Sequence, residues 1–283
     1  MSGRIVTGAI ILFWLAMMGQ LVKREILPSL EQARELAHTP NYRQLEVRAE
    51  LPRTDQMGIY LGEQRIGQSV TTVSRQEQDN ELQIRNRTDV RLGMGAGIPL
   101  LSKFMGVELR LTFRARVFES RLMGFNMVLT LGGGEPYAVV DGFVVGKELT
   151  LRIRQGGQVR TQSIPFDPQQ MISTDLMPAL TPAQLRVGAT WTMQSIDVQT
   201  MTVRKSLARV RSREQVKIAG RMRDTFVIEV PYSPGSGESF TVWASPDGEV
   251  LMQKFFGFRF EREEPAPNED GVAVESRRST QEP

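Results

Sequence analysis

The sequence predicts a mainly β protein: one large twisted antiparallel sheet or open β-barrel, preceded by a transmembrane helix and a short juxtamembrane helix. Three observations carry this prediction: an uncharged apolar run at residues 5–22, apolar–polar alternation over most of residues 45–263, and glycine-containing turns between the alternating segments. The predicted organisation is an anchor at 1–24, a helix and linker at 25–44, a β domain at 45–263 and a disordered tail at 264–283.

The first element is the apolar run, in which Thr7 and Gln20 are the only polar side chains. At a rise of 1.5 Å per residue, a helix over 5–22 would be about 27 Å long, close to the roughly 30 Å hydrocarbon core of a bilayer. The run continues directly into Lys23 and Arg24 without the small-residue site at which a signal peptide is cleaved. We therefore expect an uncleaved anchor; a cleaved signal peptide and a buried soluble helix are the alternatives.

The orientation of this anchor is set only weakly, because basic residues flank both ends of the run. A β-rich body without cysteine fits the extracytoplasmic side, although the absence of cysteine also fits a reducing compartment. The expectation is a single-pass inner (cytoplasmic) membrane protein whose C-terminal body lies outside the cytoplasm.

The second element is a short helix at about residues 29–37, where apolar side chains recur at helical spacing. It lies on the membrane, serves as a stalk, or packs on the body. Thr39 and Pro40 end it.

The β domain is clearest at residues 106–119, where apolar residues from Val107 to Val117 alternate with Glu108, Arg110 and further polar side chains. This alternation predicts a long strand with one face in a core and one in water. Hairpin turns are expected near Gly62, at Gly156–Gly157 and at Pro246–Gly248. About 11 to 13 strands are expected after some of these segments merge: 45–51, 56–62, 65–76, 81–92, 106–119, 122–131, 137–145, 148–155, 158–164, 190–196, 202–218, 225–232, 238–244 and 249–262.

Two segments depart from this alternation. Residues 167–186 interrupt the strand series and are expected to hold a turn or two. Residues 264–283 are rich in charge and proline and poor in large apolar side chains, which predicts disorder.

An apolar, glycine-bounded segment at residues 93–107 is the first candidate site. It is either a buried connection between two strands, or a loop that dips into the bilayer or closes a ligand cavity. Its candidate residues are Ile98, Leu100, Leu101, Phe104 and Met105.

A basic segment at residues 203–223 is the second candidate site. Cations at this density attract anionic lipid head groups or nucleic acid, but apolar residues alternate with them, so a solvated strand face is the competing interpretation. Nucleic acid is not expected, because no aromatic side chains for stacking lie among the cations. The candidate residues of this basic surface are Arg204, Lys205, Arg209, Arg211 and Arg213.

The composition excludes several kinds of chemistry. The chain has no cysteine and one histidine, His38, so thiol catalysis, cysteine-ligated metals and multi-histidine metal sites are excluded. The glycines near residues 95 and 133 lack the spacing of phosphate-binding loops. We expect no enzyme, no metal and no cofactor; a catalytic pair among Asp141, Asp175 and Asp197 is the one open exception.

Five segments follow one another over about residues 55–260: IYLGEQRIGQSVTTVS, the strands at 105–119, DGFVVGKELTLRIRQGG, LTPAQLRVGATWTM and FTVWASPDGEVLMQKFFGF. This succession resembles a group of uncharacterised bacterial exported β-rich domains, which occur alone or upstream of transglutaminase-like modules. The resemblance implies a twisted antiparallel sheet or open barrel and assigns no catalytic residue to this chain.

These observations predict a membrane-anchored, extracytoplasmic, non-enzymatic binding or scaffold protein of the bacterial cell envelope. Its partners would be the membrane, through residues 5–22, and another envelope protein; nucleic acid is not expected. The alternative is a carrier or sensor of a lipid or other apolar ligand held in an open β-barrel.

Overall fold

The computed structural model describes residues 40–48, 51–76, 80–91, 107–178, 181–182, 185–198, 200–232 and 239–263. The predicted anchor, the predicted juxtamembrane helix, the apolar segment before Val107 and the predicted tail lie outside these residues. Within the described part of the chain, no helix is long and apolar enough to cross a membrane.

The described residues form one short helix, α3 (Tyr42–Arg48), and fifteen strands in a single sheet. The strands are β1 (Arg53–Leu61), β2 (Gln64–Gln76), β3 (Glu81–Arg91), β4 (Glu108–Phe118), β5 (Arg121–Leu131), β6 (Pro136–Val145), β7 (Glu148–Gln155), β8 (Gln158–Pro165), β9 (Ile172–Thr174), β10 (Thr190–Asp197), β11 (Thr202–Ile218), β12 (Arg221–Pro231), β13 (Ser239–Ala244), β14 (Val250–Phe255) and β15 (Phe258–Arg262).

The order of strands follows from two meanders joined in the middle. The first runs from β1 to β8, and the second runs back from β9 at the opposite edge to β15, which pairs with β1. All pairings are antiparallel except that of β9 with β10, and β8 and β9 stay at the two edges. The predicted large antiparallel sheet is therefore confirmed, and its strand ladder is not closed.

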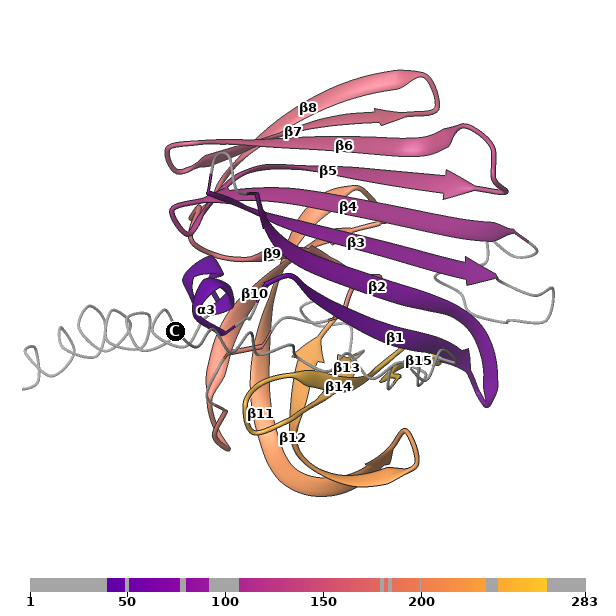
Figure 1. Ribbon diagram of the computed structural model, residues 1–283. Helices are drawn as coiled ribbons and strands as arrows, with labels where there is room; N and C mark the ends of the chain where they lie inside the picture. Colours follow the sequence, from indigo (N-terminus) through magenta and orange to yellow (C-terminus); the bar gives the residue numbers. More distant parts are fainter. Residues whose placement is uncertain are drawn as a thin grey trace, which may run out of the picture.

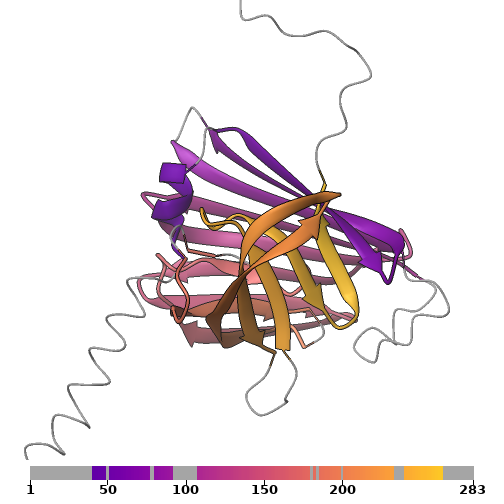
Figure 2. The same cartoon turned by 90° about the horizontal axis from the view of Figure 1, so that it is seen from below.

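The sheet rolls so that the strands of its second half cross one face of the first half (Figures 1 and 2). The alternation of each strand explains this packing. In β4 the side chains from Leu109 to Val117 on one face are buried, and Arg110, Arg114 and Arg116 point outward. The main core joins the inner faces of β1–β7 to residues of β9, β10 and β15. A second apolar cluster lies around Trp191, within the second meander.

Three local predictions were wrong. A strand was expected at 45–51, but residues 45–48 belong to α3, which Asn41 caps: its side-chain oxygen accepts the backbone N–H of Gln44 at 3.0 Å. The segment 249–262 is two strands, because Phe256 and Gly257 both have positive φ and turn the chain. Strand β9 was not predicted, since three residues are too few to show alternation.

Candidate ligand cavity

A cavity of about 160 Å³ lies inside the roll, between α3, the inner faces of β1–β4, the segment at 171–178, Thr181 and the segment at 248–250. Its lining is mostly apolar, and its four charged residues contact one another. The apolar part consists of Leu45, Met57, Val73, Ile84, Phe113, Met171, Ile172, Met177, Pro178 and Val250. An engineered apolar cavity of about 150 Å³ stays dry and binds benzene, so this space suits an apolar group of similar size.

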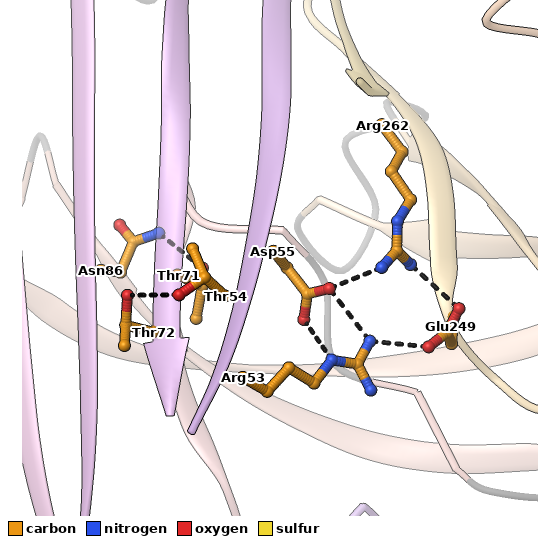
Figure 3. A network of polar contacts seen from close by, with 8 residues as sticks. All are labelled: Arg53, Thr54, Asp55, Thr71, Thr72, Asn86, Glu249 and Arg262. Atoms are coloured by element: carbon orange, nitrogen blue, oxygen red, sulfur yellow. Dashed lines mark hydrogen bonds and ion pairs between the residues drawn. The ribbon is translucent and has the colours of Figure 1, made fainter. Parts of the chain in front are cut away.

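Four charged residues form a closed ring at the polar side of this cavity (Figure 3). Arg53 contacts Asp55 at 2.9 Å and Glu249 at 2.7 Å, and Arg262 contacts the same two carboxylates at 2.6 and 3.0 Å. The ring joins β1 to β15 and to the turn before β14. Because it holds two cations and two anions, its net charge is zero, which suits a neutral or zwitterionic polar group.

Helix α3 forms a wall of the cavity and depends on one residue for its position. Tyr42 is 1% exposed, and its hydroxyl accepts the backbone N–H of Ile172 at 3.3 Å. Burial raises the pKa of this hydroxyl, which keeps Tyr42 neutral. Because a seven-residue helix is too short to be stable alone, this packing holds the wall in place.

None of the described residues of the two sites predicted from the sequence lines this cavity. Ile98, Leu100, Leu101, Phe104 and Met105 lie outside the described residues. Lys205 and Arg209 are exposed on β11, and no carboxylate within the described ranges pairs with either. Arg211 pairs with Glu229, and Arg213 pairs with Asp224.

Arg204 is a correction to the predicted basic surface. Its side chain is only 13% exposed, because it lies on the inward face of β11 with Ala208 and Val210 and contacts Asp175 in the segment after β9. Its guanidinium contacts Asp175 at 2.6 Å and Asp197 at 3.8 Å, and it lies 3.9 Å from the centre of the Tyr232 ring. Two carboxylates that were isolated in the sequence thus meet at one buried cation.

This buried cluster borders a cavity of about 20 Å³, which has room for about one water molecule. Burial raises the pKa of the Asp175 carboxyl to about 6; Arg204 opposes the rise and Asp197 adds to it. The cluster therefore holds a carboxyl that titrates in the mildly acidic range.

Because the folded pKa of Asp175 lies above the usual 3.8, its protonated form stabilises the folded state. That contribution is complete below about pH 4 and is lost as the pH rises through about 6, a change of up to roughly 3 kcal/mol at 1.36 kcal/mol per pKa unit. The variant Asp175→Asn removes this titration. We therefore expect the stability of the wild type relative to this variant to fall by about this amount between pH 4 and pH 7. Urea unfolding at intervals of one pH unit measures it, and a constant difference would contradict the assignment.

The cavity residues were not singled out from the sequence, although one signal was present. Arg53 and Asp55 occupy the same face of β1 as the buried Met57, so charge falls on positions where the alternation calls for apolar residues. Charged residues on an inward face indicate a polar site inside a sheet protein.

Comparisons with known proteins identify no family. No family model matches the chain, and no curated protein matches it. One similar solved structure is described as a beta-barrel-like protein of domain of unknown function DUF1849 from Brucella abortus. It shares 9% sequence identity at a TM-score of 0.45, over 75% of this chain and 94% of that chain.

Proposed function

We propose that this chain is a non-enzymatic binding protein that takes the apolar part of a small amphiphile into the cavity of the rolled sheet. The observation that carries the proposal is the combination of an apolar wall with a charge-balanced ring at one side of the same cavity. The apolar part of the ligand would contact Phe113 and Val73, and its polar group would lie at Arg53 and Arg262. Ligand sites of this kind combine apolar walls with a few placed polar groups.

The proposal includes the predicted location. Residues 5–22 would anchor the chain in the inner membrane, with the described body outside the cytoplasm, where amphiphiles leave and enter the bilayer. The first test is native mass spectrometry, with lipid extraction, of the full-length chain purified from membranes. A stoichiometric amphiphile supports the proposal, and a clean mass of the chain alone counts against it.

A cavity-filling variant gives the sharper prediction. Val73 lines the cavity, so Val73→Phe occupies part of the space and is expected to weaken binding of benzyl alcohol at least about tenfold. Isothermal titration calorimetry of the full-length chain measures the affinity. Val139→Phe on the outer face of β6 is the matched control and should bind as the wild type does. Equal affinities of the two variants would place the probe outside the cavity.

A second candidate function, the scaffold, is favoured by the edge strand β8. Seven of its eight residues are exposed, and no strand among the described residues pairs with its outer edge. Such an edge can accept an extended segment of a partner protein as an added strand. Photo-crosslinking from position 161 in cells tests this: a single crosslinked envelope protein supports the scaffold, and no crosslink argues against it.

A further inference from the structure

A cationic and apolar patch lies on the outer face of the sheet, at the end formed by the β4–β5 and β6–β7 turns. We call it the hairpin-end patch. Its residues come from β3, β4, β5 and β6. The cations are Arg85, Arg114, Arg116 and Arg121, and the apolar residues are Phe118, Met123, Phe143 and Val145.

The strand register brings these residues together. Arg85 lies directly opposite Arg114, and Arg116 lies opposite Gly124, whose other neighbour is Phe143. A shallow hollow of about 320 Å³ lies here, and its lining includes the three arginines, Gly124 and Phe143 together with Asn126 and Asp141. A polar head group can therefore reach the arginines while an apolar group contacts Phe143.

The apolar side chains of the patch are unusually exposed. Phe143 is 53% and Val145 is 78% exposed, and Phe118 and Met123 lie near them beside the β4–β5 turn. Exposed apolar groups that gather at one place mark a surface that contacts another apolar phase. Protruding apolar residues flanked by cations are typical of surfaces that rest at the membrane interface.

The cations of the patch are only partly neutralised. Arg116 lies 3.7 Å from Glu81, but within the described residues no carboxylate forms an ion pair with Arg85, Arg114 or Arg121. Like charges directly opposite each other, as at Arg85 and Arg114, destabilise a sheet. The nearby acids are Asp141, which Arg154 holds, and the exposed Glu119 and Glu148. An anionic surface would neutralise the remaining positive charge.

The patch also lies at the end of the sheet where the described chain begins. The backbone N–H of Leu122 donates to Pro168 at 2.7 Å, and the N–H of Met171 donates to Pro40 at 3.4 Å. Pro40 and α3 therefore lie at the same end as the two turns (Figure 1). Residues 23–39 separate Pro40 from the predicted span, a reach of at most about 60 Å at 3.3–3.6 Å per residue.

We propose that the hairpin-end patch rests on a membrane surface that carries anionic lipids. The arginines contact lipid phosphates, and Phe143 and Val145 enter the interfacial region. This inference rests on the proposed anchoring, which would bring this end of the sheet to the bilayer. It adds an orientation: the β4–β5 and β6–β7 turns face the membrane, and the β11–β12 turn lies farther from it.

The test uses the absence of cysteine in the chain, which allows a single label at a chosen position. Full-length Phe143→Cys is labelled with an environment-sensitive fluorophore and placed in nanodiscs of phosphatidylcholine with 30% phosphatidylglycerol. Full-length Met222→Cys, at an exposed position of β12, is the matched control. A lipid with a quencher near its head group should quench the label at position 143 at least about twofold more than at position 222.

The charge requirement is tested in the same way. The difference between the two positions should disappear in phosphatidylcholine alone, and also in the Arg114→Gln, Arg121→Gln double variant. Equal quenching at positions 143 and 222 in anionic discs overturns the patch while the anchoring stands.

Size-exclusion chromatography separates the two proposals. Co-elution with anionic discs but not with neutral discs supports the patch and overturns the anchoring. Elution apart from both kinds of disc overturns both.

Discussion

Replacing Arg204 by methionine is expected to lower the free energy of unfolding by about 3–5 kcal/mol at pH 7, because it leaves two buried carboxylates without their cation. The Asp175 side chain is 6% and the Asp197 side chain 14% exposed, so bulk water solvates the two carboxylates poorly. Methionine keeps much of the side-chain volume, so the loss of stability comes from the missing positive charge and not from a new cavity. Urea unfolding followed by circular dichroism measures the change.

The size of this effect should depend on pH. The pKa of Asp175 is about 6 with Arg204 present, and removing the cation raises it further. At pH 5 the variant therefore buries a neutral carboxyl and should lose less stability than at pH 7. Arg211→Met, which breaks an exposed pair with Glu229, is the control and should cost below about 1 kcal/mol. Equal losses in the two variants would show that the Arg204 cluster is not a buried ion pair in solution.

The outline of the sheet could be predicted from the sequence because its strands pair mostly with neighbours in the chain. Alternation sets which side chains face inward, and turn residues such as Gly156–Gly157, both at positive φ, set where each hairpin reverses. The pairing of β1 with β15 could not be predicted in this way. Alternation determines faces and not partners, and residues 57 and 262 are brought together only by the completed fold.

The residues of the charged ring and of the Arg204 cluster could not be predicted either, because alternation does not determine which distant segments lie together. The ring joins Arg53 to Glu249, and the buried cluster joins Asp175 to Arg204, so each depends on how distant strands lie over one another. The error at Arg204 has a different cause. Arg204 lies on the same face of β11 as Ala208 and Val210, which are buried, so the alternation already places it inward. Its charge alone grouped it with the exposed cations, and the carboxylates that pair with it come from distant parts of the chain.

Replacing Tyr42 by alanine is expected to remove about 3–5 kcal/mol of packing from helix α3, because its side chain is fully enclosed between the helix and the inner face of the sheet. The helix has too few residues to persist without that contact. We therefore expect the loss to appear as local opening: native-state hydrogen exchange at residues 42–48 should accelerate strongly, while exchange in β4 changes little.

The same variant tests whether α3 is a wall of the ligand site. If the helix closes the cavity, its opening exposes Met57 and Phe113 to water, and the affinity for benzyl alcohol should fall with it. Tyr42→Phe is the matched control: it keeps the ring and loses only the bond from the Ile172 N–H, worth about 1 kcal/mol, so it should retain most of the affinity. Unchanged affinity in Tyr42→Ala, with α3 shown open by exchange, would mean that the ligand is held by the sheet alone.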